Sequence, residues 1–254
     1  MTTQLGGGLL HVRRADGAAA ILAPALAEAG AWAMMSAAPA DMRLDGELEC
    51  WLDRWGVAAG LRLRRLRQVH GNRVAAAGDV ALDGTEADGV WTVSGEDVLS
   101  VTCADCAPVW IAAPTPQALA LVHAGWRGIA AGILDSALTA LRACGAAAES
   151  LVVAVGPHLR PCCFEVGPEV ARQFDSYPGS VQSPTALRAQ RQRRDSSALD
   201  LAIPIVSQLT ALGVATDHIY VATACTRCTP ELLHSYRRNG PGGPLMAAVG
   251  FLKA

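Results

Sequence analysis

The chain has 254 residues, of which 51% are hydrophobic, 17% are charged and 5% are aromatic, and its formal net charge is −2. This length suffices for one large domain or two small ones with a sizeable core, and the composition is too hydrophobic for a disordered protein. The near-neutral charge and the few aromatic residues argue against a nucleic-acid partner, which needs a basic surface and aromatic platforms for its bases.

The N-terminal region contains a long hydrophobic stretch, Ala18–Ala40. Two prolines and a glutamate interrupt it, so we predict neither a membrane span nor a membrane partner. Within it, Ala18–Leu26 carries apolar side chains at helical spacing, which favours an amphipathic helix over the secretory signal that Arg13-Arg14 would otherwise suggest. Without such a signal, the eight cysteines are expected to be free thiols in the cytoplasm.

The rest of the chain alternates between strand-like and helix-like segments. Leu61–Val69 partly alternates apolar and basic residues, as a half-exposed strand does. Helical periodicity marks Gly128–Cys144 and Leu199–Leu212, and Ala247–Leu252 is predicted as a closing strand. Short apolar runs predict buried strands at Val98–Thr102, Val109–Ala113, Leu119–His123, Leu151–Val155 and Ile219–Ala222. Such a mixture predicts an α/β or α+β fold with layers around a shared core.

We predict a single domain over residues 1–254, because no internal repeat or linker is visible. One segment, Ser176–Ser197, is rich in proline, glycine and arginine. It lies inside the predicted domain, so we interpret it as a loop insertion at about residues 176–197. Its arginines favour a solvated surface over an anion-binding flap, and they are Arg188, Arg191, Arg193 and Arg194.

Three segments at the ends of predicted strands carry residues with catalytic chemistry, namely Arg67–Gly71, Thr102–Pro108 and His123–Gly128. Strand ends commonly gather at one rim of a sheet, where functional sites form. There, two imidazoles and one thiolate would make the three-ligand set of a catalytic zinc site with an open fourth position; they would come from His70, Cys106 and His123. Each residue taken singly is more typical of a structural role.

The other cysteines leave alternatives open. The motifs Cys103-x-x-Cys106 and Cys225-x-x-Cys228 could together form a structural zinc site, although they lie far apart in the chain. A thioredoxin-like role for the first motif is disfavoured, because an apolar run rather than a helix follows it. The remaining cysteines are interpreted as structural or as buried hydrophobic residues: Cys162 and Cys163 in the first case, Cys50 and Cys144 in the second.

Two segments could bind an anion. A glycine-rich turn leads from His123 into a predicted helix, where free N–H groups favour an anion and Arg127 could bind phosphate. The alternative is that the glycines of this turn only permit close packing. The turn is neither a Walker loop nor a GxGxxG motif. The adjacent Arg237 and Arg238 precede a loop rich in Gly and Pro, and could hold a phosphate or a carboxylate or simply lie at the surface.

Together these segments resemble the laccase-domain family, also called YfiH-like or polyphenol oxidase-like. The matching motifs cover roughly residues 60–240 in the family's order: Arg67–Gly71, Ala87–Gly89, Ala104–Pro108, His123–Gly128, Gly156-Pro157, Cys163–Gly167, Cys225-Thr226 and Ser235–Arg238. The N-terminal segment Ala31–Pro39 departs from the family's pattern, since it lacks an expected arginine and glycines. Cys103 stands where the family usually has threonine.

The resemblance implies a single α/β domain of layered mixed β-sheets flanked by helices, with a zinc ion held by His70, Cys106 and His123. It also implies phosphorolysis of adenosine, inosine or methylthioadenosine, with adenosine deaminase activity beside it. Nucleosides and phosphate would then be the small-molecule partners. Other descriptions of the family are copper-dependent polyphenol oxidase (laccase) and peptidoglycan editing factor.

The histidine count bears on the laccase description. A blue-copper site takes two His and one Cys, and a trinuclear copper cluster takes roughly eight further His. The chain has six His in total. This excludes a multicopper laccase within one chain and leaves copper in the one metal site as an alternative to zinc.

For nucleoside chemistry, Arg127, Arg237 and Arg238 are the predicted phosphate ligands, and Asp105 is the candidate for proton handling or for support of the metal ligand. The glutamate motif of known zinc deaminases is missing. A cysteine hydrolase acting on a peptidoglycan precursor would use the same residues, with Cys106 as nucleophile and His70 or His123 as base. A catalytically silent binding protein is a third alternative.

Overall fold

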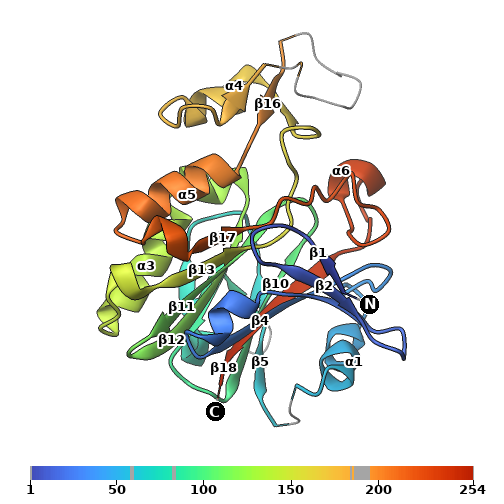
Figure 1. The fold of residues 1–254 in the computed structure, drawn as a ribbon, viewed down its shortest axis with the longest axis vertical. Coiled ribbons are helices and arrows are strands. Elements are labelled where there is room, and N and C mark those ends of the chain that lie inside the picture. Colours follow the sequence, from blue (N-terminus) through green and yellow to red (C-terminus); the bar gives the residue numbers. More distant parts are fainter. Residues whose placement is uncertain (1, 58–59, 82–83, 184, 186–194, 254) are drawn as a thin grey trace.

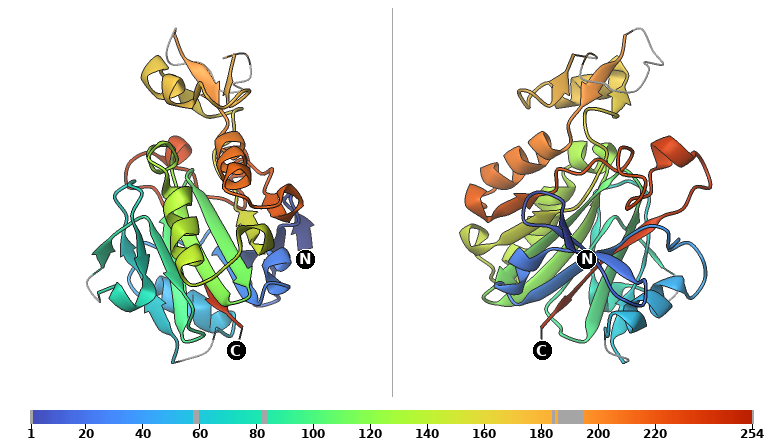
Figure 2. Two further views of the ribbon diagram at one scale, coloured as in Figure 1. Left: turned by 90° about the vertical axis from the view of Figure 1, so that its left-hand side faces the viewer. Right: turned by 45° about the vertical axis from the view of Figure 1, so that its right-hand side comes forward.

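The computed structural model describes residues 2–57, 60–81, 84–183, 185 and 195–253. Two mixed β-sheets face each other, and helices cover their outer faces (Figure 1, Figure 2). This arrangement confirms the predicted fold class, an α+β fold with layered mixed sheets flanked by helices.

The first sheet has seven strands, in the order β1 (Thr2–Gln4), β2 (Leu10–Arg13), β3 (Ala19–Leu22), β4 (Ala31–Ser36), β18 (Met246–Leu252), β10 (Asp97–Cys103) and β5 (Arg62–Arg64). Neighbouring strands are antiparallel except for the parallel pair β10 and β5. The predicted closing strand is confirmed as β18. It pairs with β4 on one side and β10 on the other, and so joins the N-terminal hairpins to the middle of the chain.

The second sheet has six strands, in the order β17 (Ile219–Val221), β13 (Val152–Val155), β11 (Ala107–Pro114), β12 (Gln117–Ala124), β9 (Gly89–Thr92) and β7 (Val74–Ala76). Strands β9, β12, β11 and β13 are antiparallel, whereas β17 and β7 pair in parallel at the two edges. The strands predicted from short apolar runs are therefore confirmed, with ends that differ by at most a few residues.

Two smaller sheets complete the fold. One pairs β6 (Leu66–Arg67) with β8 (Thr85–Glu86). The other contains β14 (Glu165–Val166), β16 (Ser197–Leu199) and β15 (Val181–Gln182), and with α4 (Pro168–Ala171) it forms a lobe above the sandwich (Figure 1). The described residues of the predicted insertion at 176–197 lie in this lobe, and its four arginines fall outside the described residues.

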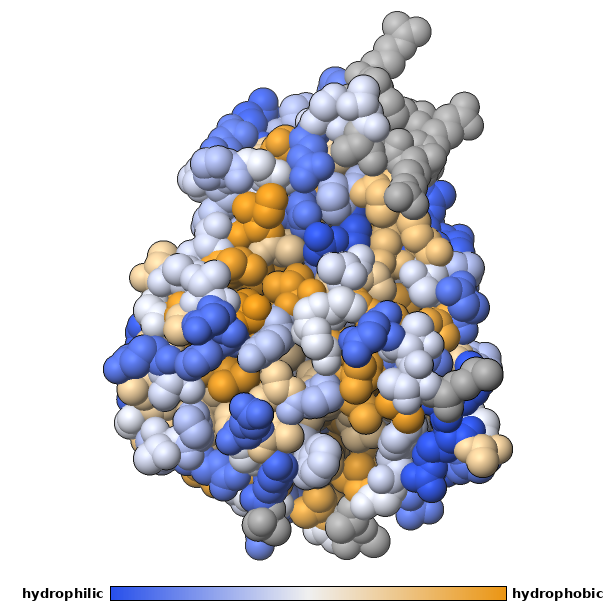
Figure 3. Space-filling view, viewed as in Figure 1, coloured by the Kyte–Doolittle hydropathy of each residue, from blue (hydrophilic) through white to orange (hydrophobic). Residues whose placement is uncertain are grey.

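The molecular surface mixes hydrophobic and hydrophilic residues. On the face shown in Figure 3, the hydrophobic residues lie in separate groups among hydrophilic ones. The exposed large hydrophobic side chains are scattered along the chain, at Trp32, Leu44, Val69, Val93 and Tyr236. In the part of the chain that the structure describes, no helix combines the length and the hydrophobicity that a bilayer crossing requires.

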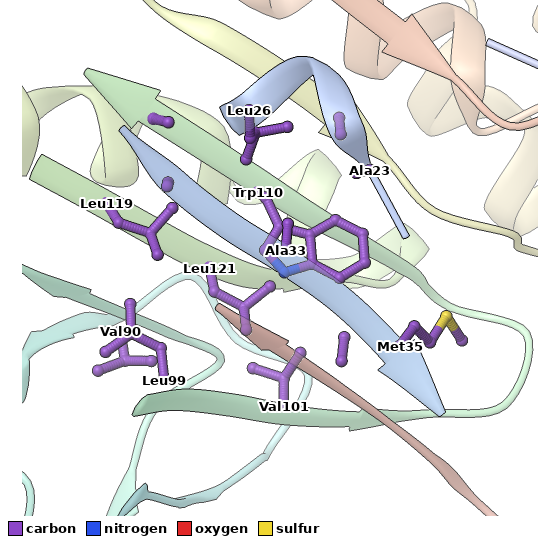
Figure 4. Close-up of a cluster of buried hydrophobic side chains, with 14 of the residues drawn as sticks. Ala23, Leu26, Ala33, Met35, Val90, Leu99, Val101, Trp110, Leu119 and Leu121 are labelled. Atoms are coloured by element: carbon purple, nitrogen blue, oxygen red, sulfur yellow. The ribbon is translucent and has the colours of Figure 1, made fainter. Parts of the chain in front are cut away.

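The central core lies between the two large sheets. Because side chains alternate between the faces of a strand, Leu99 and Val101 of β10 point inward and meet Trp110 of β11 and Leu121 of β12 (Figure 4). The indole nitrogen of Trp110 donates a hydrogen bond of 2.9 Å to the carbonyl oxygen of Val249 in β18. This bond satisfies the one polar atom of the buried ring and connects the sheets directly.

Helices close the two outer faces. Helix α1 (Glu47–Arg54) packs Leu48, Trp51 and Leu52 against the first sheet, and α3 (Ile133–Ala143) and α5 (Ala202–Ala211) pack against the second. The helix predicted over 128–144 is two helices, α2 (Trp126–Ala130) and α3, because Gly132 takes a positive φ of 85° between them. The helix predicted over 199–212 starts later, because Leu199 belongs to β16.

Two predictions about the N-terminal part are wrong. Residues 18–26 form strand β3 and a 3-10 turn (Pro24–Ala27) rather than an amphipathic helix. Strand β3 lies between β2 and β4 with both faces covered, and a strand buried on both faces has no alternating pattern to distinguish it from a helix. Cys50 is exposed rather than buried, because α1 turns its other face to the sheet; Cys144 is half-buried.

A buried carboxylate connects the two large sheets. Asp97 of β10 accepts hydrogen bonds from the Thr92 hydroxyl of β9 at 2.7 Å and from the Arg64 guanidinium of β5 at 2.9 Å. Burial raises the pKa of Asp97, but these bonds and the charges of Arg64 and Arg62 outweigh it and hold the pKa below its ordinary value of 3.8.

Replacing Asp97 by asparagine is therefore expected to lower the free energy of unfolding by about 1–3 kcal/mol at pH 7. Since the folded-state pKa is depressed, the carboxylate stabilises the protein fully above its unfolded pKa and loses this effect as the pH falls through the folded pKa. Urea unfolding of both proteins at several pH values from 7 to about 3 should show the difference shrinking in acid. The exposed Asp45→Asn is the control; a pH-independent difference would contradict the prediction.

Candidate metal centre

The segments that carry the predicted ligands meet at one end of the sandwich. Cys106 lies in the turn between β10 and β11, and His123 lies one residue before the end of β12. Strands β11 and β12 pair antiparallel with Ala107 opposite Ala124. The start of β11 therefore lies beside the end of β12, and this register places Cys106 next to His123.

His70 reaches the same place through the pairing of β6 with β8. These strands run parallel with Arg67 opposite Glu86, so the loops that follow them, which contain His70 and Asp88, lie side by side. The buried Asp88 carboxylate accepts three successive backbone N–H groups at 2.7–3.0 Å, those of Val69, His70 and Gly71. These bonds fix the loop in a conformation in which His70 has a positive φ of 59°.

The same carboxylate orients His123. Asp88 Oδ1 lies 2.9 Å from His123 Nδ1, and an ionised carboxylate can only accept, so Nδ1 carries a proton and Nε2 is the nitrogen left for a metal ion. This carboxylate–histidine arrangement is typical of zinc ligands. Burial raises the pKa of Asp88, but hydrogen bonds from His123, Gly71 and Val69 outweigh burial and lower it. The carboxylate is therefore ionised at neutral pH.

The three side chains can hold one metal ion. The nitrogen donors of His70 and His123 and the sulfur of Cys106 lie within 4.8 Å of one another, and the two imidazole rings lie edge to face. A Cβ on Gly125 would lie 3.0 Å from the Cys106 sulfur and 3.3 Å from the His70 ring, so glycine keeps this space open. Two imidazoles and a thiolate fit zinc with a fourth position left for water or substrate.

The electrostatics of the site favour an ionised thiol. Burial raises the pKa of Cys106, but hydrogen bonds and charge from His123 and His70 outweigh burial and lower the pKa to about 7. For His123, burial lowers the pKa, but Asp88 and Cys106 outweigh it and raise the pKa to about 9. Without a metal ion, these shifts favour a pair of thiolate and imidazolium over two neutral groups, and a metal that binds must displace the His123 proton.

The ligand set opens onto a cavity of about 570 Å³, within the roughly 300–1,000 Å³ typical of small-molecule pockets. Asp105 lies in its wall with a positive φ of 94°. Its Oδ1 accepts the Thr226 hydroxyl, and its Oδ2 accepts the Arg237 backbone N–H at 2.7 Å. The other lining residues include Gln68, Thr102, Trp126, Arg127, Leu159, Phe164, Leu201, Tyr236 and Leu245.

The three predicted phosphate ligands occupy different environments. Arg127 is exposed at the cavity, and its guanidinium lies over the Trp126 ring, 4.3 Å from the centroid. Arg237 also lines the cavity and donates to the Glu165 carbonyl at 3.2 Å. Arg238 is not among the lining residues, and its guanidinium donates to the backbone carbonyls of Thr226, Arg227 and Leu233.

The structure corrects the alternative that paired the two Cys-x-x-Cys motifs. Cys103 is buried between the sheets in the central core. Cys225 and Cys228 lie instead beside the vicinal pair Cys162 and Cys163, and together they form a second group of potential metal ligands.

Sequence reasoning assigned no role to two residues that build the site. Asp88 orients both histidines, and Gln68 ties the His70 loop to β10: its amide exchanges hydrogen bonds of 2.7 and 2.8 Å with the backbone of Thr102. Both lie inside motifs that carry the family resemblance. The signal that could have found them is a polar residue in such a motif that lies close to a strand end, as the ligands do.

The chain is similar in sequence to a family of known proteins. Residues 49–252 match the family described as multi-copper polyphenol oxidoreductase laccase. The purine nucleoside phosphorylase YlmD of Geobacillus stearothermophilus is 33% identical over 202 residues, which cover 78% of this chain and 73% of that protein. The purine nucleoside phosphorylase YfiH of Escherichia coli K12 is 28% identical over 184 residues, 72% of either chain.

Solved structures extend the similarity over nearly all of the chain. The crystal structure of YlmD from Geobacillus stearothermophilus has a TM-score of 0.80 at 26% identity and covers 100% of this chain and 99% of that one. Bacillus licheniformis hypothetical protein YfiH shares the fold, with a TM-score of 0.79 at 21% identity over 94% and 98% of the two chains. The chain therefore belongs to the multi-copper polyphenol oxidoreductase laccase family, as the resemblance of its motifs predicted.

Proposed function

We propose that the chain is a zinc-dependent purine nucleoside phosphorylase that cleaves adenosine, inosine or methylthioadenosine, with adenosine deamination as a side activity. The observation that carries the proposal is the triad His70, Cys106 and His123 beside a cavity that also contains two arginines. The names of the relatives support the substrate class. The eight free thiols are consistent with a protein of the reducing cytoplasm.

Zinc is proposed because the donor set fits it. A zinc ion at the triad would act as a Lewis acid on a substrate oxygen or on water. The triad is one of two groups of at least three potential ligands among the described residues, and the other consists of cysteines alone. The described residues therefore contain no histidine-rich cluster of the kind that a multicopper oxidase needs. A polyphenol oxidase would have to work with a single copper ion at the triad.

The chain's own residues account for binding and orientation. In phosphorolysis the bond between ribose C1′ and the base nitrogen breaks, a bond from C1′ to a phosphate oxygen forms, and the base takes up a proton. Arg127 and Arg237 would bind the phosphate dianion beside the cavity. Of the two roles predicted for Asp105, its contacts favour support, because both carboxylate oxygens hold the cavity wall through Thr226 and Arg237. Arg238 would hold the same loop.

Purified, zinc-loaded protein tests the proposal directly. Inosine, adenosine and methylthioadenosine are incubated with and without phosphate, and the free base and the sugar phosphate are quantified. We expect the free base and the sugar phosphate to form in equal amounts, and only when phosphate is present. Release of ammonia from adenosine measures the deaminase activity. Absence of phosphate-dependent base release from all three nucleosides would refute the phosphorylase.

Replacing Arg127 by alanine is expected to raise KM for phosphate by about 10–100-fold, the loss of one charge-assisted hydrogen bond. KM for the nucleoside should change little, and zinc content should not change. The matched control is Arg65→Ala, which removes an exposed arginine paired with Glu49. Equal rises in KM for both substrates would contradict a phosphate-binding role.

One observation favours a second candidate, a cysteine hydrolase acting on a peptidoglycan precursor. The pKa of Cys106, lowered to about 7 beside His123, is that of an activated nucleophile. The two functions separate in metal-free protein. A hydrolase would retain activity after chelation and lose it on alkylation of Cys106, whereas the phosphorylase would lose activity on chelation alone.

A further inference from the structure

A second cluster of cysteines lies outside the catalytic triad. The sulfurs of Cys162, Cys163, Cys225 and Cys228 lie within 4.8 Å of one another. The Cys228 sulfur is 3.4 Å from that of Cys163 and 3.8 Å from that of Cys162. All four cysteines are free thiols.

These distances match a tetrathiolate metal site. Four sulfurs at the zinc–sulfur distance of about 2.3 Å, placed at the corners of a tetrahedron, are separated by about 3.8 Å. Sulfurs joined in a disulfide lie at about 2.05 Å, much closer than the two distances found here. We propose that Cys162, Cys163, Cys225 and Cys228 bind a structural zinc ion, in addition to the metal ion at the catalytic triad.

Each loop holds its cysteines in a tight turn. In Cys225-Thr226-Arg227-Cys228, the Cys228 N–H donates to the Cys225 carbonyl at 3.1 Å. In the other loop, the Cys163 N–H donates to the Arg160 carbonyl at 2.9 Å. Cys163 and Cys225 are buried, so the backbone turns present part of the sulfur cluster away from water.

The proposed site joins two loops that are distant in sequence. One contains residues 160–164 and follows β13, and the other contains residues 225–228 and follows β17. A single parallel bridge between His158 and Cys225 aligns them. The side chains and the turn leave the four sulfurs facing one another, so an ion there would hold the loops together in the way that a disulfide holds loops of secreted proteins.

The position of the cluster suggests why such an ion would matter. Leu159, directly before the first loop, donates a backbone hydrogen bond of 2.9 Å to the Asp105 carbonyl. Thr226, inside the Cys-x-x-Cys turn, donates to the Asp105 carboxylate. Leu159 and Phe164 line the catalytic cavity. The structural zinc would therefore fix the wall of the cavity without touching the substrate.

Two exposed cysteines provide a matched pair for the test. Cys50 lies on α1 and Cys228 lies in the cluster, and both are exposed. In native wild-type protein, iodoacetamide should modify Cys50 and spare Cys228 until a strong chelator is added. Equal modification of the two before chelation, read by peptide mass spectrometry, would overturn the proposal.

Metal stoichiometry gives an independent measurement. Wild-type protein, purified with reductant, should contain about two zinc ions per chain, and His123→Ala and Cys228→Ser about one each. Cys144→Ser is the control and should keep both. X-ray absorption of the His123→Ala protein should show four sulfur ligands at about 2.3 Å, which tests the site without any cluster variant that could fail to fold.

A His123→Ala protein without zinc, or a Cys228→Ser protein with the wild-type zinc content, would refute the structural zinc. The proposal is separable from the nucleoside activity. Zinc bound by the cluster in a protein that shows no phosphorolysis would leave this inference standing and refute only the proposed function.

Discussion

If His70, Cys106 and His123 hold the proposed zinc ion, replacing Cys106 by alanine is expected to empty this triad of metal and to abolish the proposed phosphate-dependent cleavage of inosine. Cys106 supplies the one thiolate of the triad, and two neutral imidazoles alone hold zinc much less tightly. The loss in zinc affinity should exceed the roughly 10–100-fold typical when a group that only orients a ligand is removed. Competition with a chromophoric chelator measures the affinity, and metal analysis gives the occupancy.

The neighbouring Cys103→Ala is the control for this substitution. Cys103 is buried in the core between the sheets, and burial raises its pKa far above neutrality, so it is a neutral thiol that packs. Its replacement should lower stability slightly and leave zinc affinity at the triad unchanged; because Cys103 also lines the cavity, zinc affinity rather than turnover is the quantity to compare. If Cys106→Ala kept full phosphorolysis and full zinc content, the metal-centred account of the site would be wrong.

Replacing Asp88 by asparagine is expected to damage both stability and metal binding. The carboxylate accepts three backbone N–H groups and the His123 ring N–H, and an amide would turn hydrogens toward some of these donors. We expect a loss of about 2–4 kcal/mol in the free energy of unfolding of the metal-free protein. Zinc affinity should fall by about 10–100-fold, because both histidines lose their orientation.

Urea unfolding and zinc competition of Asp88→Asn measure the two effects separately. Asp53→Asn, on the exposed side of α1, is the control and should change neither quantity. A normal zinc affinity in the Asp88 variant would show that His123 and His70 are held by the surrounding packing rather than by the carboxylate.

Much of the fold could be predicted because its central strands are short and strongly apolar. Strands β10 to β13 were visible as hydrophobic runs, and the helical stripe of α3 was clear. Strand β3 was not recognised, because a segment buried on both faces shows no period that separates strand from helix. Sheet order depends on pairings between distant residues, such as Val249 of β18 with Ser100 of β10, which no local pattern reveals.

The candidate ligands could be predicted because each one lies within three residues of the end of a strand. The structure brings together His70, Cys106 and His123 as expected. The role of Asp88 depends on the parallel pairing of β6 with β8, strands of two residues each, which are too short to leave a sequence signal. The four-cysteine cluster likewise depends on two loops meeting in space, and the motif spacing pointed to a different pair.

Because of the path of the chain between the two sheets, a metal ion at the triad would also connect the sheets to each other. The chain leaves the first sheet at the end of β10 and enters the second at the start of β11, with Cys106 in the turn between them. His123 belongs to the second sheet, and Gln68 fastens the His70 loop to the first. An ion held by all three would clamp the two layers at one end, so chelation would loosen this end first and lower thermal stability as well as turnover.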